Sequence, residues 1–272
     1  MRPLLHVEHL VKQYPKSTQP AIVDVSFRVD AGEWFALYGL SSAGKSTILA
    51  ILATLLAKSR GRVTIAGCDL DQQAAAIRQE IGVVGSAMPL DLTLTAEENL
   101  RLHVCRHELY AYHHHYRQMA ACYRQRIAAL ATELACDLFQ PVACFSPFLQ
   151  RKLAIACSLL HDPLLLLLDE PTAGLDLQSR SALWRYLRTM RQRKGFTLVL
   201  ATANLAETSE ADRVGLLQHG ELLFEAKSHL MRSLAKSILY DEEHLYEVAN
   251  KRKLAHTRSA TGVAAPRGWH PN

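Results

Sequence analysis

Two short segments of this sequence carry residue types that can bind a phosphate group and activate a water molecule. The first, GLSSAGKS, occupies residues 39–46 between a short apolar run and a stretch with helical spacing. Glycines let the backbone curl so that successive N–H groups face inward, and the positive end of a following helix adds to this anion cradle. An ordinary Gly/Ser turn is the alternative. The motif GxxxxGK[ST] between strand and helix instead favours a phosphate-binding loop.

Every residue of this loop is a candidate ligand of a nucleotide. Lys45 can reach the β- and γ-phosphates, the Ser46 hydroxyl can bind Mg²⁺, and Thr47 is expected near the α-phosphate. The curled part of the cradle consists of Gly39, Leu40, Ser41, Ser42, Ala43 and Gly44.

The second segment is an acidic pair that follows the apolar run Leu164–Leu168. In open α/β sheets, ligands bind at the carboxyl ends of the strands. Asp169 is therefore placed to hold Mg²⁺ through water, and Glu170 to orient or deprotonate an attacking water. Two acids can also simply end a strand, but the phosphate loop earlier in the chain favours the catalytic interpretation.

Apolar patterning predicts the elements that must position these residues. The predicted strands are Leu4–Val11, Ala21–Val29, Trp34–Tyr38, Arg62–Ala66, Ile81–Val84, Leu164–Leu168, Thr197–Ala201 and Val214–Leu217. The predicted helices are Thr47–Leu56, one continuous helical pattern over Thr95–Leu138, Arg151–Leu160, and a last one that ends near Arg193. Strands that alternate with helices predict a mostly parallel sheet covered by helices, and Thr95–Leu160 interrupts it as a helical insert.

Composition limits the classes of protein that remain. The 272 residues are 49% apolar and 21% charged with a net charge of +5, which is typical of a globular domain with a core. No run approaches the roughly 20 apolar residues that span a bilayer, and no signal peptide is expected. Six cysteines without a CxxC pair indicate reduced core thiols. No basic run is interleaved with aromatic residues, so no nucleic-acid partner is expected.

The longest motif resembles one particular family. The run LLHDPLLLLLDEPTAGLD at 159–176, with QRKLAIACSLL just before it, resembles the ATP-binding-cassette (ABC) ATPases. Tyr14, 25 residues ahead of the phosphate loop, resembles the aromatic residue that stacks on adenine. Ala173–Asp176 resembles the loop that contacts the opposite subunit. The resemblance covers roughly Leu4 to Leu230.

This resemblance implies an α/β fold of the P-loop NTPase type. It consists of a RecA-like, mostly parallel sheet core with an antiparallel β subdomain and a helical subdomain. The domain is expected over 1–242, with its helical subdomain at about 87–162, and 243–272 is expected to be a polar, disordered tail. The implied cofactors are ATP and Mg²⁺.

The resemblance also implies partners and a location. The partners would be a separate transmembrane permease subunit and a second ATP-binding subunit, in a homodimer or heterodimer. The chain would be cytoplasmic and peripheral on the inner face of the cell membrane, bound through the permease. The segment GRVTIAG resembles subunits paired with exporters of drugs, polysaccharides or lipids.

Three positions depart from the family pattern. The glycine-rich signature reads Phe145–Leu149, where Ser146 is the one remaining phosphate ligand. Ser86 stands at the position of a glutamine that contacts Mg²⁺ and water, and Ala203 at that of the switch histidine. Asn204 is adjacent, but its side chain is expected to point elsewhere. Losing one hydrogen bond to a charged transition state slows a reaction by roughly 10- to 100-fold. We therefore expect nucleotide binding to persist and hydrolysis to be weak.

The predicted helical insert also contains a run of histidines. His103 and His107 lie one turn apart and can share a metal ion, whereas His113–His115 fan out around a helix. A solvated helical surface, or a docking face for the membrane partner, is the favoured interpretation.

Three rival functions remain after the motifs are considered. A non-catalytic ATP-binding regulator or assembly protein suits the altered signature, but the retained Glu170 opposes it. Cassette proteins that act on ribosomes or DNA usually carry two cassettes or a long coiled-coil insert. A P-loop kinase has no use for the LLLLLDEP, AGLD and QRKLAIA segments.

Overall fold

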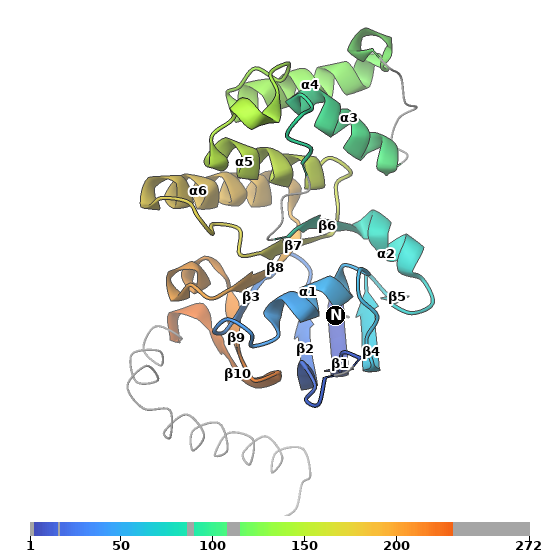
Figure 1. The fold of residues 1–272 in the computed structure, drawn as a ribbon, viewed down its shortest axis with the longest axis vertical. Coiled ribbons are helices and arrows are strands. Elements are labelled where there is room, and N and C mark those ends of the chain that lie inside the picture. The colour runs from blue at the N-terminus through green and yellow to red at the C-terminus, as the bar shows by residue number, and fades with distance from the viewer. Residues whose placement is uncertain (1–2, 16, 86–89, 108–114, 231–272) are drawn as a thin grey trace, which may run out of the picture.

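The computed structural model describes residues 3–15, 17–85, 90–107 and 115–230. Ten strands of this part form one sheet in the order β5-β4-β1-β2-β10-β9-β3-β8-β7-β6 (Figure 1). The strands are β1 Leu5–Lys12, β2 Ile22–Val29, β3 Trp34–Tyr38, β4 Arg60–Ile65, β5 Cys68–Asp69, β6 Ile81–Val84, β7 Leu165–Asp169, β8 Thr197–Thr202, β9 Arg213–Gln218 and β10 Glu221–Lys227. The helices are α1 Lys45–Leu52, α2 Ala74–Glu80, α3 Ala96–Arg106, α4 Ala121–Leu134, α5 Pro147–Ser158 and α6 Leu177–Lys194, with 3-10 turns η1 Tyr116–Gln118, η2 Val142–Cys144 and η3 Leu205–Glu210.

The sheet has a parallel half and an antiparallel half. Strands β9, β3, β8, β7 and β6 run parallel to their neighbours in that order. Strands β2, β1, β4 and β5 pair antiparallel. This division confirms the expected fold class, a parallel core with an antiparallel β subdomain.

Alternate residues of β3 face the two layers that cover the sheet. Phe35 and Leu37 pack into the core that contains α1, whereas Trp34 and Ala36 pack into the core that contains α6. All four are fully buried. A short, wholly apolar strand is expected in this setting, because both of its faces are covered. The covering helices hold the end of β3, and so the loop that follows it, in place.

The helical insert between β6 and β7 is not one continuous helix. The region over Thr95–Leu138 is helical as predicted, but it is divided into α3 and α4, a break that the sequence did not indicate. A capping box between Thr95 and Glu98 begins α3, and Ala135 in a left-handed conformation ends α4. Tyr123 and Ile127 of α4 share a buried core with α3. The chain folds back because two short helices bury an apolar face that one long helix would leave exposed.

Three small elements were not predicted from the apolar pattern, and two cysteines are more exposed than expected. These elements are β5, α2 and β10, and each is too short or too polar to give a periodic signal. Among the cysteines only Cys157 is buried, whereas Cys122 and Cys144 are exposed, so the expectation of core thiols was wrong for these two. The predicted tail over 243–272 lies outside the described residues.

Candidate functional site

The candidate site forms where three adjacent parallel strands end. β8 lies between β3 and β7, so their carboxyl ends meet at one edge of the sheet. The backbone N–H of Gly39 donates to Thr202 O at 3.3 Å, and that of Glu170 donates to Ala201 O at 2.9 Å. The phosphate loop, the acidic pair and the segment at Ala203 are thereby brought together, as the sequence predicted for the first two.

The phosphate loop needs its glycines. A Cβ atom on Gly39 would lie 2.2 Å from Leu217 O, and one on Gly44 would lie 2.5 Å from Ile22 Cδ1. Gly44 also has φ = 106°, and Ser42 has φ = 67°. Helix α1 begins after Gly44 without a side-chain cap. Its first N–H groups therefore remain available to an anion.

Lys45 lies buried inside the curl of this loop. Its Nζ donates hydrogen bonds to Gly39 O at 2.8 Å and Leu40 O at 3.0 Å. The same atom lies 3.7 Å from Glu170 Oε1. An ammonium held between loop carbonyls and a carboxylate is well placed to exchange these contacts for phosphate oxygens.

Glu170 is held in a particular orientation by the end of β8. Its Oε1 accepts a hydrogen bond of 2.8 Å from the backbone N–H of Ala203, and its own φ is 48°. Burial raises the pKa of Glu170, and the negative charges of Glu207 and Asp169 raise that pKa further, against the opposing effect of Lys45. A carboxylate with a raised pKa is a better proton acceptor near neutral pH.

Asp169 carries a buried oxygen that suits a metal ion. Its Oδ1 is buried and has no hydrogen-bond partner among the described residues. Buried carboxylate oxygens are rarely left unpaired. The donor set of Asp169 and the exposed hydroxyl of Ser46 is all oxygen, which is the chemistry that Mg²⁺ prefers. The residues present therefore fit Mg²⁺.

Tyr14, the predicted adenine-stacking residue, lies beside the first turn of α1. Its hydroxyl is 3.3 Å from Thr47 Oγ1, and the residue is 40% exposed. The sequence reasoning missed Lys12, whose Nζ lies 5.3 Å from the Tyr14 ring centroid and donates to Ala57 O at 2.6 Å. Lys12 is the last residue of β1 and lies two residues before Tyr14, and this spacing was the available signal. A ring that is supported on one side and exposed on the other can stack on a flat ligand.

The turn after β9 contacts the phosphate loop and supports it, a role that the sequence analysis did not predict. Gly220 N–H donates to Ala43 O at 3.1 Å. A Cβ atom on Gly220 would lie 2.7 Å from Ala21 O, so only glycine fits there.

One predicted site position lies apart from the loop. Ser146 begins α5 in the helical insert, away from α1 (Figure 1), and its Oγ accepts a hydrogen bond of 3.3 Å from Leu149 N–H. Pro147 is the first residue of that helix. Ser86 lies outside the described residues. Asn204 is engaged elsewhere, since its Oδ1 accepts from Ala206 N–H at 3.0 Å, as expected.

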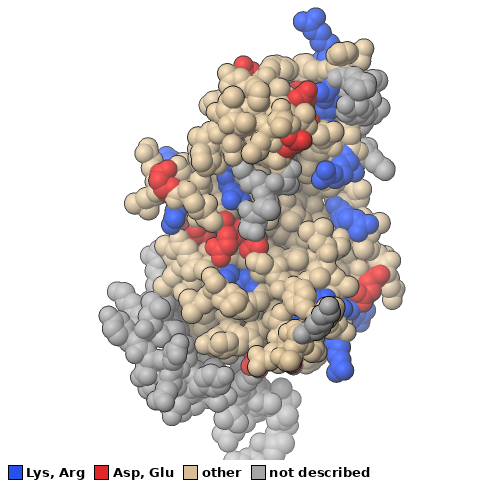
Figure 2. Space-filling model, viewed as in Figure 1, with Lys and Arg blue, Asp and Glu red and all other residues tan. Residues whose placement is uncertain are grey.

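One face of the molecule shows how charge is distributed around the sheet edge. Figure 2 shows acidic side chains gathered in a hollow between the helical insert and the sheet, with basic side chains at its edge. In the part of the chain that the structure describes, no helix is long and apolar enough to cross a bilayer.

The sheet order, the glycine loop ahead of α1 and the acid pair after β7 define a nucleotide-binding protein of the P-loop class. Residues 22–173, more than half of the chain, match the ABC transporter family, and the chain belongs to this family.

Named relatives and a solved structure agree with this assignment. The chain is 34% identical to a Nod factor export ATP-binding protein of Sinorhizobium fredii, over 77% of this chain and 60% of that protein. It is 31% identical to a linearmycin resistance ATP-binding protein of Bacillus subtilis, over 81% of this chain and 68% of that protein. A solved ATP-binding subunit of an ABC transporter matches with a TM-score of 0.72 at 28% identity, over 91% of this chain and 99% of that one.

A further solved structure shows the same fold. A dimeric ATP-binding cassette bound to ADP and phosphate is 24% identical, with a TM-score of 0.72 over 82% of this chain and 98% of that one. The chain thus spans nearly the full length of these solved cassettes, but only 60–68% of the two curated relatives.

Proposed function

We propose that this chain is the ATP-binding subunit of an ABC exporter, which binds Mg-ATP, hydrolyses it slowly and drives a separate membrane permease. The observation that carries this proposal is the meeting of the buried Lys45, the open start of α1 and Glu170 at one sheet edge. Tyr14 adds a platform for the base, next to Thr47.

The residues of the site can perform phosphoryl transfer to water. Glu170 takes a proton from the attacking water, whose oxygen forms a bond to the γ-phosphorus while the bond to the β–γ bridging oxygen breaks. The products are ADP and phosphate. Lys45 and the N–H groups at the start of α1 stabilise the charge on the phosphate oxygens. Asp169 and Ser46 would hold Mg²⁺, which neutralises further charge on those oxygens.

Hydrolysis is slow in this proposal because Ala203 offers no side-chain hydrogen-bond donor to the γ-phosphate. The Ala203 backbone N–H orients Glu170, but the methyl side chain of Ala203 has no donor to offer a phosphate. One missing hydrogen bond to a charged group lowers the rate by about 10- to 100-fold. ATP binding depends on Lys45 and the loop, so it is retained.

A second cassette completes the site in our proposal. The start of α5, with Ser146, would contact the nucleotide of a partner cassette, in a homodimer or heterodimer. The dimeric solved relative supports this arrangement. The export direction and the membrane permease rest on the printed descriptions of the two curated relatives. The chain would then lie on the cytoplasmic face of the membrane, bound to that permease.

Phosphate release from the purified chain with Mg-ATP tests this function. We expect slow turnover that disappears in Lys45→Ala and rises about 10-fold in Ala203→His, because the histidine supplies the missing donor. The matched control is Lys227→Ala, an exposed lysine of β10, which should leave turnover unchanged. Turnover on the order of 10 per second in the unaltered chain would contradict the weakened site.

The absent side-chain donor at Ala203 also favours a second function, that of a non-catalytic ATP-binding regulator built on the same cassette. In that case Mg-ATP would bind with Lys45-dependent affinity, while phosphate release would stay at the level of Lys45→Ala even in Ala203→His. These two results together would replace the exporter proposal.

A further inference from the structure

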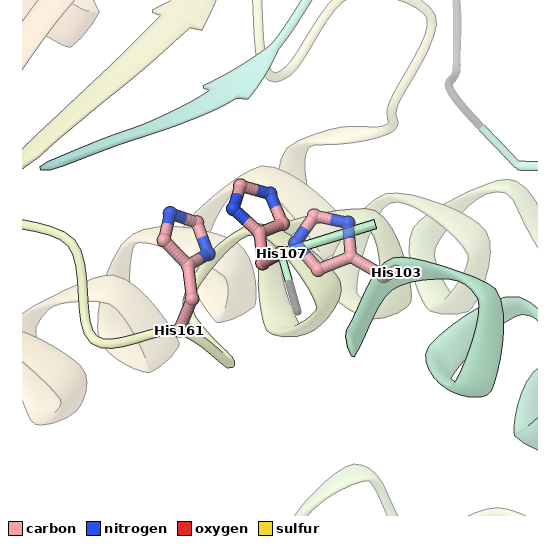
Figure 3. Close-up of side chains that lie close together, drawn as sticks. All are labelled: His103, His107 and His161. Carbon is pink, nitrogen blue, oxygen red and sulfur yellow. The ribbon is translucent and has the colours of Figure 1, made fainter. Parts of the chain in front are cut away.

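Three histidines from two separate segments meet in a cavity of about 590 Å³. His103 and His107 lie one turn apart at the end of α3, and His161 lies between α5 and β7. The phosphate loop and the acidic pair are not part of the cavity lining. Figure 3 shows the His107 ring between those of His103 and His161. His103 and His107 are half-buried and line this cavity, so they do not form a solvated surface, whereas the alternative of a docking face for the membrane partner stays a prediction.

The rings are close enough to share one ion. The His103 and His107 centroids are 4.7 Å apart, and the His107 and His161 rings stack at 3.8 Å. One nitrogen of each residue lies within 4.8 Å of the other two. Nitrogens bound to one tetrahedral Zn²⁺ at about 2.0–2.1 Å lie roughly 3.4 Å apart. The His107 and His161 rings are stacked with their planes 10° apart, so one ring must turn out of the stack before the in-plane lone pairs of both can point at one ion.

Two of the nitrogens are buried without a hydrogen bond. His161 Nε2 bonds to Ile81 O at 2.9 Å, so this nitrogen carries the proton and Nδ1 carries the lone pair. His161 Nδ1 and His103 Nε2 are both buried and have no partner among the described residues. Buried polar atoms are normally paired. A histidine that donates one N–H to a backbone carbonyl and leaves the other nitrogen free is the usual arrangement of a metal ligand.

Charged groups near the cluster also bear on the binding of a cation, and Asp162 follows His161 directly. Arg106 adds a nearby positive charge, but its side chain is exposed, so water screens the repulsion.

We propose that His103, His107 and His161 form a binding site for one divalent transition-metal ion of the class that prefers imidazole, represented by Zn²⁺. Three neutral nitrogens and a fourth position open to the cavity are the ligand set of such sites. The bound ion ties the end of α3 to the segment ahead of β7 and, through Ile81, to β6. Metal binding therefore stabilises the helical insert against the sheet.

Titration of the chelator-treated full chain with Zn²⁺ tests the site, measured by calorimetry and by the visible spectrum of Co²⁺ as a substitute. We expect one ion per chain, tetrahedral Co²⁺ absorption and a rise in Tm on adding Zn²⁺. His161→Gln and His107→Gln should each weaken Zn²⁺ binding by at least about 100-fold, since loss of an outer partner alone weakens binding 10- to 100-fold. Both variants should lose the Zn²⁺-dependent rise in Tm.

The matched control is the histidine run, changed together as His113→Gln, His114→Gln and His115→Gln. This triple variant should bind Zn²⁺ as tightly as the unaltered chain. The proposal is overturned if the triple variant loses the ion, if the cluster variants keep it, or if the unaltered chain binds no Zn²⁺ below the millimolar range. Using two separate cluster variants keeps the test decisive if one of them fails to fold.

Discussion

Helices α1 and α5 both begin at a point where the chain could face a phosphate, but their first turns are built in opposite ways. The residue before α1 is Gly44 at φ = 106°, and no side chain caps the helix. The residue before α5 is Ser146, whose hydroxyl accepts from Leu149 N–H, and Pro147 occupies the first helical position. The first N–H groups of α1 thus lack side-chain acceptors, whereas one of those of α5 is bonded to Ser146 and another is absent because of Pro147.

The difference shows that a helix N-terminus can either bind a ligand or be capped to stabilise the fold. Glycines without a cap leave a helix start unsatisfied until an anion arrives, which is suitable only where a ligand binds. Serine followed by proline is a stabilising start for a helix, because the missing N–H of proline is one that no helix uses. The chain has kept the first arrangement at its nucleotide loop and adopted the second at its signature.

The largest effect is expected from a substitution that distorts the phosphate loop before α1. Gly39→Ala places a methyl group 2.2 Å from Leu217 O, so the loop must shift. We expect a loss of about 3 kcal/mol in the free energy of unfolding and loss of ATP binding, measured by denaturant titration and by calorimetry. Gly67→Ala is the control. Gly67 has φ = 81°, which disfavours alanine, but a methyl group there meets nothing within 4 Å, so a loss of only about 1 kcal/mol is expected. Equal losses in both variants would contradict a close-packed loop.

The next largest effect is expected from removing the positive charge of Lys45, at the start of α1. Lys45→Ala deletes the ammonium that the loop carbonyls hold, and the affinity for Mg-ATP should fall by roughly 10- to 100-fold. Calorimetry measures this affinity, with Lys227→Ala as the control. An unchanged affinity would mean that α1 alone binds the phosphates.

Removing the cap of α5 should affect stability but not the chain's own nucleotide site. Ser146→Ala should lower the free energy of unfolding by about 1 kcal/mol, because Leu149 N–H loses its acceptor. Ser181→Ala, an exposed position within α6, should change it by less than about 0.5 kcal/mol. In a monomer, ATP affinity should be the same in all three proteins. A fall in Ser146→Ala would bring Ser146 into the chain's own site and remove the contrast between the two helices.

The smallest effect on the free energy of unfolding is expected at Glu170, whose carboxylate lies near Lys45 of α1. Burial raises the pKa of Glu170, so the folded chain binds this proton more tightly than the unfolded chain does. Its stabilising contribution is present at low pH and is lost as pH rises through the raised pKa. Glu170→Gln should therefore raise the free energy of unfolding at pH 7 by a few tenths of a kcal/mol, and the gain should shrink at pH 4. Thermal unfolding at both pH values measures it. A loss at pH 7 would mean that the ion pair with Lys45 outweighs burial.

The nucleotide site could be predicted from the sequence because its signals are local. GLSSAGKS and the acid pair each follow an apolar strand, and parallel strands end at one edge, so their meeting followed from strand order. Contacts between distant segments had no such signal. The support of Ala43 by Gly220 joins the loop after β3 to the turn after β9, far away in the sequence, and His161 reaches His107 only because α3 folds against α5.

The missed break between α3 and α4 has a different physical cause. No glycine or proline interrupts the sequence there, and helical propensity is continuous across it. The break follows from the need of two apolar faces to bury one another, with Tyr123 and Ile127 against Leu100. Such a tertiary preference overrides local propensity and leaves no mark on the pattern.

The hydrogen bond from Gly220 to Ala43 has a consequence for the order in which a ribosome makes the chain. The phosphate loop emerges early, but the strands on both sides of β3 are β8 and β9, and the turn that supports the loop follows β9. At about 5–20 residues per second, the segment from loop to turn takes roughly 10–35 s to synthesise. The nascent loop therefore remains without its neighbours and support for most of translation, and competence to bind ATP comes only with the last strands.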